Sequence, residues 1–194
     1  MIVQQLAFNR QDLVPYMSEK TLFYHYDKHY IGYINKVKKL VKNTDLEDKP
    51  LDDILEHSKN PMLIKNAHQI LNHEFFWKSI SPVKDQQIPI DLSIKLIEHF
   101  GSIQNFKDVF FNQAMDHAGS GWVWLYEKSK DLYVKVTPDT DTMVGSDPAE
   151  NPLMVLDIWE HAYYLDYYND KSNYIKTFLE HLINWDFISK NLTI

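Results

Sequence analysis

Asp157 and His161 form the first pair of residues in the sequence that could do chemistry together. They stand four positions apart, just after an apolar run over residues 152–156 that predicts a buried strand. A side chain placed just beyond such a strand is held by a rigid element and can point into a pocket. A carboxylate and an imidazole at this spacing can bind one metal ion, because each offers a lone pair. The same pair could instead cap a helix and pack against aromatic rings, so it decides nothing alone.

The first predicted helix places three polar side chains on one face. From residue 18 to about residue 42, apolar and aromatic residues recur at three- and four-residue steps, which is typical of a helix. His25, His29 and Tyr33 are spaced i, i+4 and i+8 on it, so they share a face in successive turns. This face could supply a metal ligand, or it could be a polar and aromatic stripe packed against a neighbouring helix. The zinc-protease sequence HExxH is absent, because no Glu follows His25.

A second predicted helix over residues 62–79 carries Gln69 and His73, which also share one face. The two helices would form an antiparallel hairpin. The sequence then offers four candidate ligands: His25, His73, Asp157 and His161. Three neutral imidazoles and one carboxylate make a site too hard for copper(I) and too rich in nitrogen for calcium or magnesium. Iron, manganese and zinc all fit, and ligand type alone does not choose among them.

The elements around these residues predict an α+β fold in two parts. Residues 1–82 would be an N-terminal helical hairpin domain, with an extended arm over residues 1–17 and a short helix over residues 51–57. The loop over residues 81–89 contains two prolines and is the best boundary. Residues 83–194 would be a mixed domain whose strands, 122–126, 132–136 and 153–158, form a three-stranded antiparallel sheet. Its helices would cover residues 91–100, 102–117, 163–168, 172–182 and 185–189. The metal site would lie between the two domains.

Composition excludes several classes of protein. The 194 residues are 44% hydrophobic and 24% charged, which is typical of a globular chain. A formal net charge of -7 argues against a surface that binds nucleic acid or an anionic membrane. The sequence has no Cys, so disulfides, thiolate metal sites and Cys nucleophiles are excluded. No signal peptide is visible and no apolar run approaches the ~20 residues of a membrane span. We therefore expect a cytoplasmic protein without membrane or nucleic-acid partners.

The sequence closely resembles the iron/manganese superoxide dismutase family over nearly the whole chain, and four segments carry the resemblance. They are YHYDKH at residues 24–29 with Tyr33 beyond it, NAHQILNH followed by FFW at residues 66–77, GSGWVWL at residues 119–125, and DIWEHAYY at residues 157–164. The resemblance implies that the four candidate ligands bind one iron or manganese ion per subunit. That ion would cycle between +3 and +2 while two superoxide anions become dioxygen and hydrogen peroxide. The resemblance also implies a homodimer whose metal site lies near the subunit interface.

Gln69 is the residue that the resemblance links to the choice of metal. In iron-type members a Gln on the second helix, four positions before the second His ligand, hydrogen-bonds the metal-bound solvent and adjusts the redox potential. In manganese-type members this Gln comes from the loop between the second and third strands, and residues 139–141 here contain none. We therefore expect iron, with manganese as the alternative.

The resemblance assigns further roles around the site. Tyr33 would relay protons, and His29 would form the entrance with it and meet Tyr164 of the neighbouring subunit. Glu160 would reach across the dimer to bond the partner subunit's His161. Three indole rings would wall the site, although the same rings could be ordinary aromatic core: Trp77, Trp122 and Trp159.

At several positions the sequence departs from the family pattern. This sequence has Leu71 where the family usually has an aromatic residue, His68 where it has a small residue, and Ala118 where it often has Phe. It has Tyr30 where a His is common, and Lys171 and Tyr168 where the family has Arg. None is a ligand, so they bear on rate and metal preference. Because the net charge repels an anion, attraction of substrate would depend on a local positive funnel, for which Lys28 and Lys171 are the candidates. The remaining histidines fit no site and are expected at the surface or at helix ends: His57, His99, His117 and His181.

Two other classes of function stay open from the residues alone. The chain could be a metal-binding but inactive member with a structural or interaction role, which the changes at Leu71 and His68 would favour. It could also be a zinc hydrolase that uses the same three His and one Asp, although no general base is evident beside them.

Overall fold

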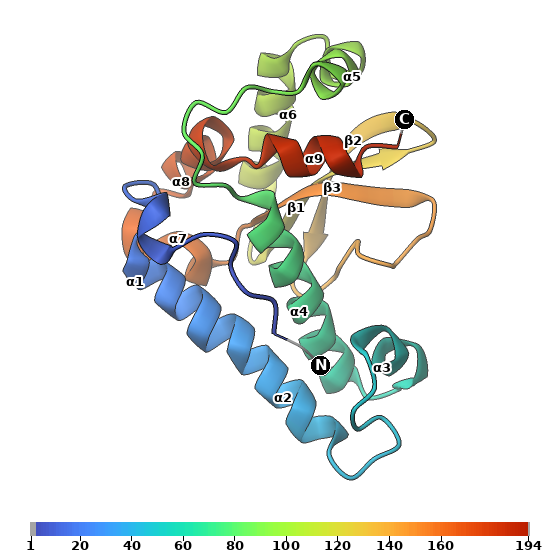
Figure 1. Cartoon of the computed structure of the whole chain (residues 1–194). Helices are drawn as coiled ribbons and strands as arrows, with labels where there is room; N and C mark the ends of the chain where they lie inside the picture. Colours follow the sequence, from blue (N-terminus) through green and yellow to red (C-terminus); the bar gives the residue numbers. More distant parts are fainter. Residues whose placement is uncertain (1–2, 194) are drawn as a thin grey trace.

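The computed structural model describes residues 3–193 and consists of a helical hairpin followed by a part built on a small sheet (Figure 1). The helical part contains η1 (Arg10–Leu13), α1 (Glu19–Leu22), η2 (Phe23–Tyr30), α2 (Ile31–Val41), α3 (Leu51–His57) and α4 (Pro61–Ser79). The predicted α+β fold class is confirmed. The N-terminal arm is not wholly extended as expected, because Asn9 and Asp12 cap a short 3₁₀ turn within it.

The first long helix begins where the sequence predicts and runs through α1, η2 and α2 without a break. The Ser18 hydroxyl accepts a hydrogen bond from Thr21 N and so satisfies a free N–H of the first turn. The middle segment, η2, is π-helical rather than α-helical. Such wider turns are rare and occur frequently at functional sites. The spacing of His25 and His29 predicted their shared face but gave no sign of this wider turn.

Helix α4 joins the two parts of the molecule. Asn60 caps its first turn by accepting from Met62 N and Leu63 N, and Pro61 follows at a position where no N–H is needed. One side of α4 packs against α2 in an antiparallel hairpin, and α4 also packs against strand β3 (Figure 1). At its C-terminal end the buried Ser79 hydroxyl accepts from Val155 N at 3.0 Å. The helix is therefore fixed against both the hairpin and the sheet.

As the sequence predicts, the sheet has three antiparallel strands, and their order is β2-β1-β3. They are β1 (Gly121–Lys128), β2 (Asp131–Pro138) and β3 (Glu150–Asp157). The central strand β1 is almost entirely buried because both of its edges are paired and both of its faces are covered. At Gly121 a Cβ atom would lie 2.7 Å from Thr137 O, so the close approach of β1 and β2 requires glycine there.

In the described part of the chain, six further helical segments accompany the sheet. They are α5 (Ile90–Phe100), α6 (Ile103–Asp116), α7 (Glu160–Tyr167), α8 (Lys171–Thr177), η3 (Phe178–Leu182) and α9 (Trp185–Asn191). Gly101, at φ 82°, ends α5, and the Ser102 hydroxyl then caps α6. Helix α7 lies against α1, which brings the segment after β3 back to the helical hairpin (Figure 1). Among residues 3–193, no helix is both long enough and apolar enough to span a bilayer.

Candidate metal centre

The structure brings the four predicted ligands together from four separate elements. His25 comes from η2, His73 from α4, Asp157 from the end of β3 and His161 from α7. Asp157 Oδ2 lies 3.0 Å from His25 Nε2, 3.2 Å from His161 Nε2 and 3.8 Å from His73 Nε2. One donor atom from each residue lies within 4.8 Å of all the others. An ion about 2.1 Å from each nitrogen holds its neighbouring donors roughly 3 to 4 Å apart, so the spacing fits one shared metal ion.

Asp157 is aimed by its backbone and by its neighbours. Strand pairing sets it opposite Trp122, and the Tyr174 hydroxyl donates to its backbone carbonyl at 2.9 Å. Its Oδ1 atom accepts from Trp159 N at 2.8 Å. These contacts fix the carboxylate and leave Oδ2 facing the three imidazoles.

His73 presents a lone pair to the same point. Its Nδ1 donates to the backbone carbonyl of Gln69, one turn earlier in α4, at 2.6 Å. That bond fixes the tautomer in which Nε2 is unprotonated. Nε2 is buried and has no hydrogen-bond partner within residues 3–193. A buried acceptor without a partner costs free energy, and a metal ion at this point would satisfy it.

The protonation states of the cluster suit a cation. Burial lowers the pKa of His25, partly offset by its hydrogen bond to Asp157, and burial lowers the pKa of His73 further. Burial alone would raise the pKa of Asp157, but the charges and hydrogen bonds of His161 and His25 outweigh it and lower that pKa. At neutral pH, His25 and His73 are therefore uncharged and the aspartate is ionised. These are the forms in which both side chains bind metals.

Gln69 and the predicted tryptophans surround the ligands. The Gln69 side chain is 1% exposed, and neither its amide oxygen nor its amide nitrogen has a partner in the described part of the chain. Unpaired buried amides are rare, and this one is free to hydrogen-bond a group bound within the site. The three indole rings contact ligand rings, with centroids 4.7 Å apart for Trp77 and His25, 5.0 Å for Trp122 and His73, and 5.5 Å for Trp159 and His161.

Tyr33 and His29 are half-buried and lie beside the ligand rings. The Tyr33 ring is 5.4 Å from the His73 ring, and burial, together with Asp157 and Asp139, raises the pKa of Tyr33 to about 12. Its phenol is therefore protonated at neutral pH. The His29 ring stacks on His161 at 4.1 Å, and burial with its two neighbouring imidazoles lowers the pKa of His29 to about 4.

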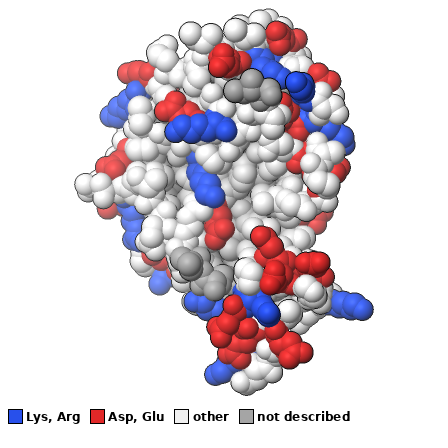
Figure 2. All heavy atoms as spheres, turned by 45° about the vertical axis from the view of Figure 1, so that its right-hand side comes forward, with Lys and Arg blue, Asp and Glu red and all other residues white. Residues whose placement is uncertain are grey.

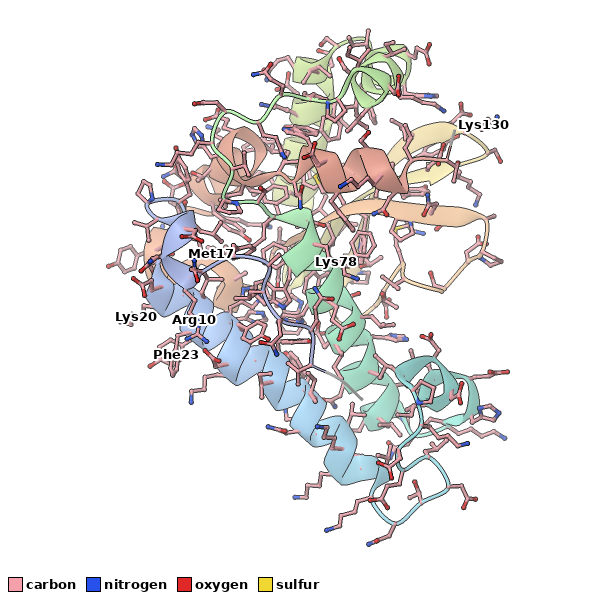
Figure 3. All side chains as sticks on the ribbon, viewed as in Figure 1. Arg10, Met17, Lys20, Phe23, Lys78 and Lys130 are labelled. Atoms are coloured by element: carbon pink, nitrogen blue, oxygen red, sulfur yellow. The ribbon has the colours of Figure 1, made fainter. Side chains whose placement is uncertain are left out.

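A shallow hollow on the surface opens beside His161. Its lining includes His29, Lys20 and the exposed Glu160 and Tyr164. Figure 3 shows Lys20 and Phe23 projecting outward from the first helix on the side away from α4. Glu160 and Tyr164 thus lie where a second subunit could reach them.

The departures from the family pattern lie around the site without entering the ligand cluster. Tyr30 is fully buried and donates to Glu74 Oε1 at 2.9 Å, with its ring 6.3 Å from the His73 ring. His68 is half-buried near Asp141 on an unbroken α4, so it does not crowd the helix. The other departures are a half-buried Leu71, a half-buried Lys171, an exposed Ala118 and an exposed Tyr168.

Two useful residues were missed from the sequence. Tyr174 stood in a predicted helix with no pattern to distinguish it, yet its hydroxyl holds the backbone of Asp157. Lys36 lies one turn after Tyr33, with its ammonium 5.6 Å from that ring. Its i+3 spacing from Tyr33 was a signal that could have found it.

A buried site of three imidazoles and one carboxylate, set between a helical hairpin and a three-stranded sheet, defines a metal-binding protein of the iron, manganese or zinc class. Two family models identify the family within this class. The model "iron/manganese superoxide dismutases, alpha-hairpin domain" matches residues 2–81, and the model "iron/manganese superoxide dismutases, C-terminal domain" matches residues 89–191. The chain belongs to the iron/manganese superoxide dismutase family. It is therefore an oxidoreductase that acts on superoxide, and the zinc hydrolase alternative is wrong.

Individual relatives agree over almost their full lengths. The chain is 39% identical to Superoxide dismutase (Fe) of Synechococcus elongatus, covering 96% of this chain and 94% of that one. It is 40% identical to Superoxide dismutase (Fe) of Plasmodium falciparum, over 97% of this chain and 94% of that one. It is also 40% identical to Superoxide dismutase (Fe) of Babesia bovis, over 96% of this chain and 93% of that one. The predicted domain boundary near residue 82 stays a prediction.

The buried imidazoles predict how the metal-free chain responds to acid. His25, His73 and His29 have folded pKa values below the ordinary 6.5, so the unfolded chain binds more protons just below that pH. We expect the free energy of unfolding to fall as pH drops from about 7 to about 5, approaching about 1.4 kcal/mol per pH unit for each fully buried histidine. Urea unfolding of the metal-free protein at a series of pH values measures this.

The matched variants separate the buried histidines from the rest. His73→Gln should reduce the change in the free energy of unfolding per pH unit. His57→Gln, which changes an exposed residue, should leave that change as it is in the unchanged protein. A free energy of unfolding that does not change across this range would contradict the assignment of neutral buried imidazoles.

Proposed function

We propose that the chain converts two superoxide anions into dioxygen and hydrogen peroxide with one iron ion bound per subunit by His25, His73, Asp157 and His161. The observation that carries this proposal is the convergence of these four buried side chains, with neutral His25 and His73 and an ionised Asp157. When bound, iron supplies the one-electron chemistry, accepting an electron from one superoxide and giving it to the next. The remaining work falls on the side chains around it.

Those side chains control protons and water. Formation of hydrogen peroxide needs two protons, and Tyr33 Oη carries one close to the ligand His73 because its pKa is raised. Gln69, buried with an unpaired amide, can donate a hydrogen bond into the site from Nε2. The rings of Trp77, Trp122 and Trp159 line the ligands and restrict access of bulk water. A site enclosed in this way strengthens each electrostatic interaction within it.

The position of Gln69 supports iron over manganese. Its unpaired amide stands on α4, one turn before His73, which is the arrangement of iron-type members. The loop between β2 and β3 has Asp139, Thr140 and Asp141 at the corresponding place and no amide side chain. The relatives named Superoxide dismutase (Fe) support the same choice.

The function is tested by metal analysis of the purified protein together with a superoxide assay before and after exposure to peroxide. We expect about one iron per chain and dismutase activity that peroxide destroys. His25→Ala should lose most of the metal and the activity, because it removes a ligand, whereas the exposed His57→Ala should keep both. Zinc in place of iron, or full iron loading without activity, would refute the proposal. Manganese with peroxide-resistant activity would refute the metal assignment.

Gln69→Ala tests the amide separately from metal binding. An N–H that donates into the site favours negative charge there and hence the trivalent ion, so its loss should raise the reduction potential. We expect unchanged iron content and a shift of at least about 60 mV, a tenfold change for a one-electron couple, measured by redox titration. Gln104→Ala, on the surface of α6, is the control. A potential equal to that of the unchanged protein would remove Gln69 from this role.

We also propose that the chain is a homodimer formed through the face that carries the hollow beside His161. The support is a group of exposed apolar and aromatic side chains on η2 and α7, which lie side by side: Phe23, Tyr24, Tyr164 and Leu165. In such a dimer Glu160 would reach the partner subunit's His161, and His29 would meet the partner's Tyr164. Exposed patches of this kind mark interfaces more often than isolated apolar residues do.

Leu165→Lys tests this interface without changing a ligand. The new charge would have to be buried, so we expect the variant to be largely monomeric at micromolar concentration. Light scattering after size exclusion measures the mass. Ile94→Lys places the same charge on an exposed part of α5 and should leave the mass unchanged. A Leu165→Lys protein with the mass of the unchanged protein would contradict the proposed face.

A further inference from the structure

The charge of this chain opposes its proposed substrate. Superoxide is an anion, and the chain carries a formal net charge of -7. The acidic side chains are not evenly spread, because many gather at one end of the molecule over α3 and the loop before it (Figure 2). A cleft with one local sign of charge can still draw an opposite ion against the overall charge. The question is which cation near the metal centre does so.

Lys36 is placed beside the entrance residues. It lies on α2, three positions after Tyr33 and seven after His29, so all three share one face of the helix. Its ammonium lies over the Tyr33 ring, 5.6 Å from the centroid. The same ring lies 5.4 Å, between centroids, from the ring of the ligand His73. The positive charge of Lys36 also contributes to the lowered pKa of His29. The ammonium is thus close to both residues at the outer side of the cluster.

Four other cations near the site contact groups other than Tyr33. Lys65 lies 3.7 Å from Asp139, the carboxylate that also acts on Tyr33. Arg10 pairs with Asp27 at 2.6 Å. Lys28 lies over the Phe23 ring at 4.8 Å, and Lys171, half-buried, donates to His117 O at 3.2 Å. These two were the cations expected from the sequence, and neither contacts Tyr33.

Lys36 keeps its charge uncompensated. It is exposed and forms no ion pair with any carboxylate of residues 3–193. Contact with the Tyr33 ring holds the ammonium in place without neutralising it. The hollow beside His161, with Lys20 in its lining, belongs to the face that we assign to the dimer, so we infer that superoxide approaches past the half-buried Tyr33.

We propose that Lys36 is the residue that steers the superoxide anion to the metal centre, past Tyr33. The inference rests on the proposed function, since it needs an anionic substrate. Lys36 acts on the rate of encounter and takes no part in proton transfer. Its removal should therefore lower kcat/KM and leave kcat nearly unchanged.

Four variants test the proposal on the iron-loaded protein. Lys36→Gln should lower kcat/KM about twofold to fourfold at low salt, and Lys36→Glu about fivefold to tenfold, because the charge change doubles. Lys36→Arg keeps the positive charge, so its kcat/KM should equal that of the unchanged protein. Lys38→Gln, two positions further along α2, makes the same change in net charge but points away from Tyr33 and should have little effect. In Lys36→Gln the decrease of kcat/KM with added salt should also become shallower.

A binding measurement separates this proposal from the proposed function. Azide, a small inorganic anion, can be titrated against the absorption spectrum of the iron-loaded protein without turnover. Lys36→Gln should bind azide about twofold to fourfold more weakly, with Lys38→Gln unchanged. Equal azide affinity and equal kcat/KM in Lys36→Gln and Lys38→Gln would overturn the steering role, while dismutase activity of the unchanged protein would still support the function. Absence of dismutase activity together with weakened azide binding in Lys36→Gln would refute the function and keep Lys36 as an anion-attracting residue.

Discussion

A fully buried carboxylate surrounded by imidazoles is the constraint on which the rest of the structure depends. Taking Asp157 out of water is costly, and two of its closest neighbours, His25 and His73, are themselves held uncharged by burial. One carboxylate oxygen is satisfied by the Trp159 N–H, and the other is shared among three ring nitrogens. A multivalent cation at their common centre balances the buried charge and completes the coordination of His73.

The fold holds the four ligand side chains around one common centre. The metal centre needs side chains from the helical hairpin and from the end of the sheet, so the two parts must be fixed relative to each other. Helix α4 does this, since it packs against α2 and β3 and its Ser79 hydroxyl accepts from a strand N–H. The π-helical turn of η2 sets His25 and His29 on a wider spiral than an α-helix would. Tyr174 then fixes the backbone of Asp157 from α8.

The sequence predicted those parts of the site that have a periodic or positional signature. Helical spacing placed His25 with His29 and Gln69 with His73, and the apolar run before Asp157 marked the strand that aims it. The three-stranded sheet followed from alternation and from turns. The π-helical turn escaped prediction because residues four positions apart, such as His25 and His29, share a face in both α- and π-helical turns. Tyr174 escaped because a tyrosine that donates to a distant backbone carbonyl looks like any buried aromatic residue. The Lys36 contact escaped because exposed lysines are common, and an i+3 spacing from Tyr33 does not by itself show that the ammonium lies over that ring.

Anomalous X-ray scattering at the iron absorption edge, from crystals of the iron-loaded protein, tests the central claim most directly. The account predicts one strong peak per subunit, about 2.1 Å from His25 Nε2, His73 Nε2, His161 Nε2 and Asp157 Oδ2. A peak elsewhere, or a peak at this centre that leaves any one of the four atoms beyond bonding distance, would contradict it.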